Sequence, residues 1–171
     1  MKILKKRNFF LSLLLRIVCN KNHTQFEKIK IVDFNKKKYD STQTIFEKQI
    51  IDALTLIKRL SPIKYKRVLS QINSICYTKR LKEDSYITSL NTYVTNGLTQ
   101  WKDQKLMHIY YAGLLIYLSA YGCLTSKNLD YYMEDKLKIY DICINIEKRF
   151  YKKVEKLYPE YKDLLIEKFI D

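Results

Sequence analysis

The chain has 171 residues, of which 47% are hydrophobic, with 15 Tyr and 7 Phe but only 3 Gly and 2 Pro. This composition excludes a disordered or low-complexity protein, and the lack of a repeat with a period of about 20 to 50 residues argues against a solenoid. The length fits one domain of roughly 130 residues behind a basic leader, since domains commonly run to about 100 to 150 residues.

The net charge of +14 is unevenly distributed along the chain. Residues 1–40 carry 11 Lys and Arg against 3 Asp and Glu, whereas residues 41–171 carry 21 against 15. In the second part Lys and Glu alternate through helical segments, as they do on a solvated surface. The excess therefore belongs mostly to the leader. An AT-rich genome is a second explanation for a composition so rich in Lys, Ile, Asn and Tyr.

The first 24 residues form the leader, in which a basic cluster precedes an apolar segment of about ten residues. The segment is too short to span a bilayer, which takes about 20 apolar residues, and the residues before Cys19 are larger than those at a signal-peptide cleavage site. Its apolar side chains recur at helical spacing beside cations that suit anionic headgroups. We expect a membrane-surface anchor or a helix packed on the domain, with a secretory signal as the third alternative. The anchor residues are Lys5, Lys6, Arg7, Phe9, Phe10, Leu13 and Leu14.

The four cysteines favour a reducing compartment. They lie at positions 19, 76, 123 and 143, which is too far apart for a Cys-x-x-Cys metal site, and they are too few for a disulfide framework. We expect reduced and mostly buried thiols, and hence a cytoplasmic protein, peripheral at a membrane where the leader acts as an anchor.

Beyond the leader, hydrophobic periodicity predicts both strands and helices. The predicted elements up to residue 95 are a strand at 28–34, helices at 42–60 and 62–69, and strand segments at 71–78 and 85–95. Pro62 suits the first turn of its helix, because a proline there loses no helical hydrogen bond. The last two segments are rich in β-branched and aromatic residues, so we expect them to pair as a small antiparallel sheet.

A central helix is predicted over residues 106–121. Among its side chains only His108 and Ser119 are clearly polar, so the helix is apolar nearly all round and should form the spine of the core. Asp103 is the expected N-cap and Gly122 the expected C-cap.

The rest of the chain is predicted to be helical. A long helix runs from about 128 to 158 and a short one over 161–170, with Pro159 between them. Residues 25–171 are thus expected to form a single, mostly helical α+β domain that contains a small antiparallel sheet.

Three residue patterns follow one another within residues 45–155. They are Ala53-Leu-x-Leu-Ile-x-x-Leu-Ser-Pro-x-x-Tyr-x-Arg-Val68, then Gly113-Leu-Leu-Ile before a five-residue site, then Ile139-x-x-x-Cys143-x-x-x-Glu147. In this order they resemble small bacterial proteins with a zinc-peptidase-like HExxH helix. The resemblance implies zincin-like core helices, with a leucine-rich helix before a few strands, the HExxH site on the next helix, and a glutamate further along as a third ligand.

Residue by residue, the resemblance puts the two ligand histidines at Tyr117 and Tyr121 and the general-base glutamate at Leu118. The third-ligand glutamate falls at Tyr140. Zinc hydrolysis needs three ligands that are available at neutral pH and a base for the metal-bound water. A phenol with a pKa of about 10 is a poor ligand, and a leucine is no base. The resemblance therefore implies a domain that binds no metal or other cofactor and is not an enzyme.

We expect this non-catalytic domain to act by binding a protein partner, and an anionic membrane surface is a second candidate partner through the leader. No Gly-rich phosphate loop and no Gly-x-Ser-x-Gly motif points to another chemistry. The alternative is a basic nucleic-acid-binding or regulatory protein with an unrelated helical core. The charge favours this alternative, although the sequence has no named nucleic-acid-binding motif.

The substituted positions also lead to a structural hypothesis. If Tyr117, Tyr121 and Tyr140 converge, their rings fill the former cavity. Their hydroxyls then need partners, because a buried unpaired polar group costs about 1 to 3 kcal/mol. Glu147, on the same helix face as Tyr140, is the expected acceptor. The alternative is that these are ordinary core tyrosines and that the pattern is accidental.

Overall fold

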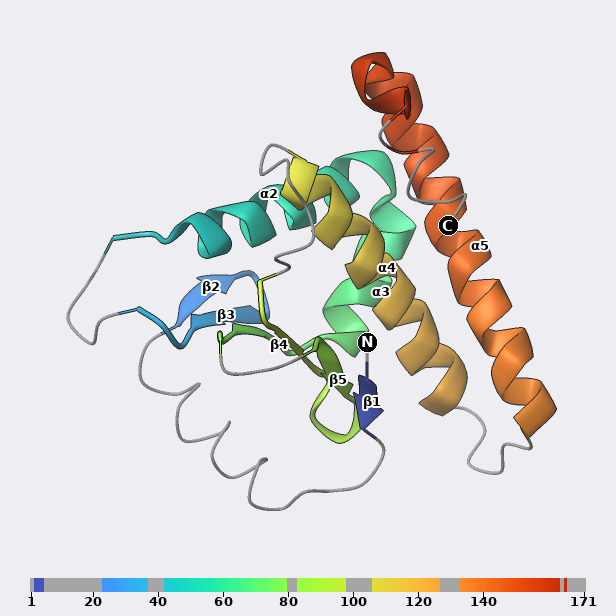
Figure 1. The fold of residues 1–171 in the computed structure, drawn as a ribbon, viewed down its shortest axis with the longest axis horizontal. Coiled ribbons are helices and arrows are strands. Elements are labelled where there is room, and N and C mark those ends of the chain that lie inside the picture. The colour runs from blue at the N-terminus through green and yellow to red at the C-terminus, as the bar shows by residue number, and fades with distance from the viewer. Residues whose placement is uncertain are drawn as a thin grey trace.

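The computed structural model describes residues 2–4, 23–36, 42–79, 83–97, 106–126, 133–163 and 165. Helices lie over one face of a mixed sheet, and a long helix runs along their outer side (Figure 1). The strands are β1 (Lys2–Leu4), β2 (Thr24–Phe26), β3 (Ile29–Asp33), β4 (Ser74–Tyr77), β5 (Ser85–Ile87) and β6 (Thr92–Thr95). The helices are α2 (Ile45–Leu60), α3 (Pro62–Gln71), α4 (Met107–Ser126) and α5 (Met133–Leu157), with short 3-10 turns η1 (Thr88–Leu90) and η3 (Pro159–Tyr161). The expected helix-rich α+β fold is confirmed.

The strands lie in the order β1-β5-β6-β4-β3-β2. At the centre, β3, β4 and β6 are parallel neighbours. Toward the edges, β5 runs antiparallel to β6, β2 runs antiparallel to β3, and β1 pairs in parallel with β5. The two edge strands, β1 and β2, thus both precede residue 27 in the chain.

The expected antiparallel pairing of residues 71–78 with residues 85–95 is wrong. The second segment contains two strands, because the chain turns at η1 and at Asn91, whose φ of 49° lies in the left-handed region that Asn tolerates. The antiparallel neighbour of β6 is therefore β5, and β6 runs parallel to β4 with Cys76 opposite Val94. The sheet is mixed and not antiparallel.

A capping box sets the start of α2 at Ile45, whereas the sequence predicted a start at residue 42. The Thr44 hydroxyl accepts a hydrogen bond from the Glu47 backbone N–H, and the Glu47 carboxylate accepts one from the Thr44 N–H at 2.8 Å. Lys36 Nζ lies 3.1 Å from the same carboxylate, so the buried charge of Glu47 is paired.

The spine of the core is α4, as predicted. It packs against α2, α3 and α5, and between Leu106 and Tyr121 all but three side chains are buried. Among the described residues, Met107–Thr125 is the one stretch with the length and hydropathy of a membrane-spanning helix. In this domain 72% of that stretch is buried, as it is in the core helix of a folded protein.

The expected C-cap at Gly122 is wrong, because α4 continues to Ser126. Gly122 instead allows close packing, since a Cβ there would lie 3.0 Å from both Gln71 Oε1 and Tyr86 Oη. The expected N-cap, Asp103, lies outside the described residues. The end of α5 just before Pro159 agrees with the prediction, and most of the predicted last helix lies outside the described residues.

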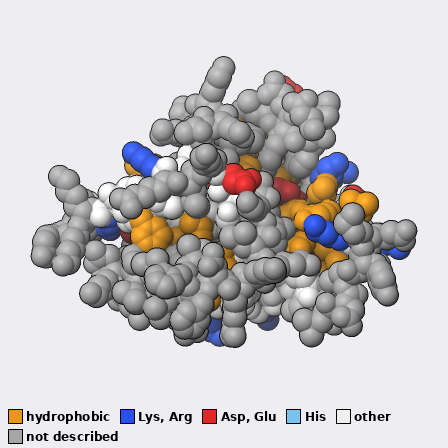
Figure 2. All heavy atoms as spheres, turned by 60° about the horizontal axis from the view of Figure 1, so that its bottom comes forward, with side chains coloured by type: hydrophobic (Ala, Val, Ile, Leu, Met, Phe, Trp, Pro, Cys, Tyr) orange, Lys and Arg blue, Asp and Glu red, His pale blue; other side chains and the backbone are white. Residues whose placement is uncertain are grey.

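The sheet face opposite the large core carries a second, smaller apolar cluster. Its buried members are Val32, Cys76, Ile87 and Val94, with Phe34 and Leu90 packed against them. Figure 2 turns the sheet side of the molecule toward the viewer, and the described hydrophobic side chains show there in two patches with Lys and Arg mainly toward the edge.

Each of the 3 glycines of the chain faces a tyrosine ring. A Cβ at Gly97 would lie 2.3 Å from Tyr77 Cε2, and a Cβ at Gly113 would lie 2.1 Å from Tyr151 Oη. Gly97 also has a φ of 75°, in the left-handed region that glycine enters without a steric cost. The tyrosine rings therefore lie closer to the backbone than they could if Gly97 or Gly113 carried a Cβ.

Replacing Gly113 by Ala is expected to destabilise the fold, because the new methyl group meets the ring of Tyr151 at 2.1 to 2.8 Å. Such overpacking costs about 1 to 3 kcal/mol, against up to about 1 kcal/mol that Ala gains over Gly in a helix. Gly122→Ala is the matched control on the same helix, since its contacts begin at 3.0 Å. Urea unfolding should give the lower stability for Gly113→Ala. Equal stabilities would contradict the close approach of Tyr151.

Candidate functional site

The four positions that the resemblance assigns to zinc chemistry lie on the two helices α4 and α5, which pack together. Tyr117, Leu118 and Tyr121 belong to α4, and Tyr140 belongs to α5. The rings of Tyr121 and Tyr140 stack, with centroids 5.7 Å apart and an interplanar angle of 24°. Leu118 and Tyr121 are buried, whereas Tyr117 and Tyr140 are partly exposed. The packing of α4 on α5 thus brings these side chains to one place.

Tyr117 belongs to the same group of side chains. Burial raises the pKa of its phenol, and the neighbouring Cys143, Tyr140 and Glu147 raise it further. Burial likewise raises the pKa of the Cys143 thiol to about 12, although the Arg67 guanidinium opposes this. Both groups are therefore neutral at physiological pH.

Glu147 takes part in a side-chain hydrogen bond with a residue that the sequence patterns do not single out. That residue is Tyr151, one turn further along α5 and buried against Gly113 of α4. Burial raises the pKa of Tyr151 well above its ordinary value, and the hydrogen bond with Glu147 adds to this. The spacing of four residues between Glu147 and Tyr151 was the available signal, because such residues are neighbours on a helix.

Another carboxylate, that of Asp84, is buried just before β5. Its oxygens accept hydrogen bonds from the Tyr93 hydroxyl, from the Thr95 hydroxyl at 2.9 Å and from the Asn96 backbone N–H at 3.0 Å. Three donors on one carboxylate offset the cost of burying its charge. Asp84 thereby ties the loop before β5 to the end of β6.

Tyr110 of α4 lies between the two carboxylates. Burial raises the pKa of Tyr110 first, and Asp84 and Glu147 both add to the rise. Tyr93 and Tyr151 are both within electrostatic reach of Tyr110, and the Tyr151 hydroxyl is 3.5 Å from the Tyr110 backbone oxygen. A row of tyrosines therefore extends from Asp84 beside the sheet to Glu147 on α5, in addition to the expected tyrosine group around Tyr117.

The described residues contain no group of three or more His, Cys, Asp or Glu side chains that could hold a metal ion. Comparison with known proteins finds no matching family model, no matching curated protein and no matching solved structure. The zinc-peptidase-like resemblance therefore rests on the residue patterns of this chain alone.

Of the predicted leader, the structure describes only β1, His23 and the first residue of β2. The described segment of the leader that forms β1 lies at the edge of the sheet beside β5. The candidate membrane-anchor residues, which lie outside the described residues, are Lys5, Lys6, Arg7, Phe9, Phe10, Leu13 and Leu14.

An alkaline titration tests the burial of the tyrosines. Burial raises the pKa of Tyr86, Tyr93, Tyr110, Tyr111, Tyr117 and Tyr151. The unfolded chain ionises its phenols near pH 10, whereas the folded chain keeps these neutral, so stability should hold below about pH 10 and fall as pH rises further. Part of the tyrosinate absorbance should therefore appear only when the helical circular dichroism signal is lost. Ionisation of every tyrosine near pH 10 with that signal intact would contradict the burial.

Proposed function

We propose that this chain is a non-catalytic domain with zinc-peptidase-like core helices, and that it acts by binding a protein partner. The observation that carries the proposal is the stacking of Tyr121 on Tyr140, together with the full burial of Leu118 on α4. In the proposed alignment with a zinc peptidase, Tyr121 and Tyr140 take the positions of two metal ligands, and Leu118 takes the position of the general base. The raised pKa of Tyr117, caused first by burial, supports the same reading, because a neutral phenol is a poor metal ligand.

The surface of α5 supports a protein as the partner. Leu137 is 68% exposed, and Ile144, two turns further along, is 39% exposed. Because seven residues make about two helical turns, these two side chains lie on the same side of α5. Ile142, which is 45% exposed, points to a different side of α5, because it is five residues beyond Leu137. Large apolar side chains grouped on one exposed surface favour contact with another protein.

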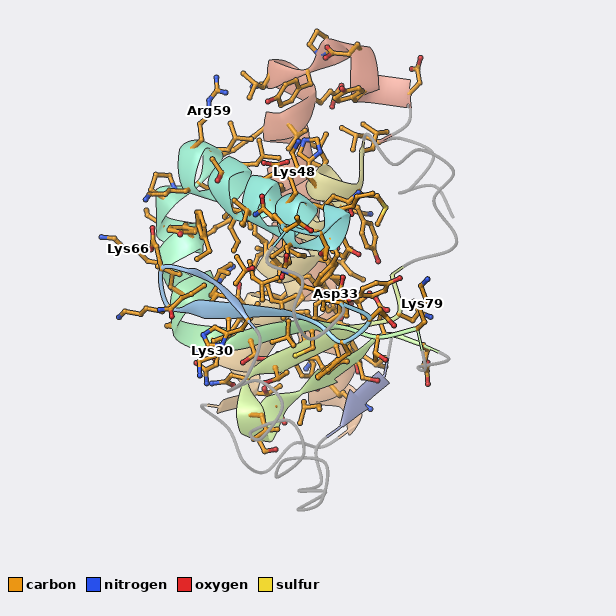
Figure 3. All side chains as sticks on the ribbon, turned by 90° about the vertical axis from the view of Figure 1, so that its left-hand side faces the viewer. Lys30, Asp33, Lys48, Arg59, Lys66 and Lys79 are labelled. Carbon is orange, nitrogen blue, oxygen red and sulfur yellow. The ribbon has the colours of Figure 1, made fainter. Side chains whose placement is uncertain are left out.

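The nucleic-acid alternative draws on the net charge of +14. On the side of the molecule that Figure 3 presents, the labelled cations point outward from separate places and do not line one track. These cations are Lys30, Lys48, Arg59, Lys66 and Lys79. Because nucleic-acid backbones bind along continuous basic surfaces, these five cations do not support the nucleic-acid alternative on this side of the molecule.

Restoring the three ligands tests the zinc-peptidase-like geometry. The variant carries Tyr117→His, Tyr121→His and Tyr140→Glu, and Leu118 stays, because a buried glutamate would destabilise the fold and metal binding needs no base. The natural chain is expected to purify without stoichiometric zinc. The triple variant is expected to bind about one zinc ion per chain and to unfold at a higher temperature when zinc is present. Metal analysis and thermal unfolding measure the two effects.

The matched control keeps Tyr140 and changes only Tyr117 and Tyr121 to His. It should bind zinc much more weakly than the triple variant, because the third ligand is missing. Stoichiometric zinc in the natural chain would overturn the non-catalytic assignment. A folded triple variant with no more affinity for zinc than the control would overturn the zinc-peptidase-like geometry.

Substitutions on α5 test the protein partner. Leu137→Glu combined with Ile144→Glu should leave the fold intact, because both side chains are exposed, and should abolish retention of the partner by the immobilised chain. Ile63→Glu is the control, since Ile63 is 86% exposed on α3. Equal retention by all three chains would contradict the role of α5. Retention that nuclease treatment removes would support the nucleic-acid alternative.

A further inference from the structure

Two lysines link α3 to α5 through backbone oxygens. Lys64 Nζ, from α3, donates a hydrogen bond to the Ile146 carbonyl of α5 at 3.0 Å. Lys153 Nζ, from α5, donates to the Leu60 carbonyl at 3.2 Å and to the Ser61 hydroxyl at 3.3 Å, at the start of α3. Both ammonium groups thus lie between the two helices, and both have neutral partners.

Two arginines lie beside these lysines. Arg67 follows Lys64 by one turn of α3, and its Nε donates to Ser119 Oγ of α4 at 3.4 Å. Arg67 Nη2 is buried and has no hydrogen-bond partner among the described residues. Arg149 precedes Lys153 by one turn of α5 and is exposed. We call Lys64, Arg67, Arg149 and Lys153 together the α3–α5 cation cluster.

Within the part of the chain that the structure describes, no carboxylate forms an ion pair with the α3–α5 cation cluster. The ion pairs between described residues involve Lys36, Lys58 and Lys162, and none includes a member of the cluster. Burial lowers the pKa of Lys64 to about 8, and Lys153, Arg67 and Arg149 each add to the lowering. Like charges held together in this way repel one another, and a bound anion would remove the repulsion.

We propose that the α3–α5 cation cluster binds a phosphate group, carried by a small molecule or by a lipid headgroup. Each ammonium has three N–H donors, so Lys64 and Lys153 keep donors beyond those that hold them in place. Arg149 offers the planar pair of donors that fits a phosphate, and the partly buried Arg67, with its Nη2 unpaired among the described residues, adds a positive charge beside the site. This inference does not depend on whether the domain is catalytic.

The test compares Lys64→Met/Lys153→Met with Lys66→Met. Lys66 lies on the same helix as Lys64, is exposed, and points away from the molecule (Figure 3), so its substitution controls for the loss of a surface lysine outside the cluster. Titration calorimetry with inorganic phosphate and with sulfate is expected to show saturable binding by the natural chain and by Lys66→Met. The double variant should lose about tenfold or more in affinity, because two charge-assisted hydrogen bonds are removed.

Vesicles separate the two sources of the phosphate group. Flotation with phosphatidic acid vesicles, against phosphatidylcholine vesicles at the same salt concentration, reports a lipid headgroup, whereas binding of free phosphate alone reports a soluble ligand. Either result supports the site if the double variant loses the binding and Lys66→Met keeps it. Equal binding by the three chains, or no saturable binding to any probe, would overturn the proposal.

The unfolding temperature and the pH dependence of sulfate affinity distinguish an anion-binding Lys64 from a lysine with a merely structural role. Without an anion, Lys64→Met should unfold at a higher temperature than the natural chain, because repulsion from Arg67, Arg149 and Lys153 is relieved. The same variant should lose the rise in unfolding temperature that low millimolar sulfate gives the natural chain. Sulfate affinity of the natural chain should fall as pH rises through about 8, because Lys64 then loses its proton. A pH-independent affinity across that range would contradict the role of Lys64.

Discussion

The architecture depends on one helix that has no polar face. The 20 residues of α4 include few polar side chains, so water cannot cover any side of it without a cost in free energy. The packing of α2, α3 and α5 around α4 meets this requirement. Because α3 and α5 both pack against α4, they are also brought within hydrogen-bonding reach of each other. The position of the cation cluster is therefore a consequence of how the apolar helix is covered.

The buried tyrosines specify how the helices and the sheet pack against one another. Each buried ring supplies apolar area, but its hydroxyl must find a partner, and this limits the ways in which two elements can pack. The Tyr86 hydroxyl donates to the Gln71 carbonyl at 2.8 Å, and the Tyr93 hydroxyl donates to Asp84. The rings near Gly97, Gly113 and Gly122 lie almost on the backbone. Polar groups thus select one arrangement among many that would bury similar apolar area.

Local sequence signals were sufficient to predict the helices. The Ser61-Pro62 pair predicts the boundary between α2 and α3, and the scarcity of polar side chains predicts the central position of α4. Strand pairing could not be predicted in the same way, because it depends on where the chain reverses. The left-handed turn at Asn91 divides one β-rich segment into two strands and changes which of them lies beside β4. The three-residue strand β1 has too short a pattern to be recognised apart from its partner β5.

The site residues likewise divide into those that local sequence spacing predicts and those that depend on how the helices pack. Tyr117 and Tyr121 share one side of α4 because they are four residues apart, which a sequence reveals. The hydrogen bond between Glu147 and Tyr151 also depends on the room that Gly113 leaves on the facing helix. Lys64 and Lys153 look like ordinary surface lysines in the sequence. Only the approach of α3 to α5 shows that their neighbours are cations and neutral oxygens.

The order of strands in the sheet has a consequence for how the protein is made. Both edge strands leave the ribosome before β4, β5 and β6, and β1 has no partner until Ser85–Ile87 has been synthesised. A contact across so long a stretch of chain forms slowly, because a large loop must close first. The early product is therefore the hairpin of β2 and β3 beside an unpaired strand, with exposed edges that favour aggregation. The middle of the sheet is thus synthesised after both of its edges, and β1 cannot take its place in the sheet before then.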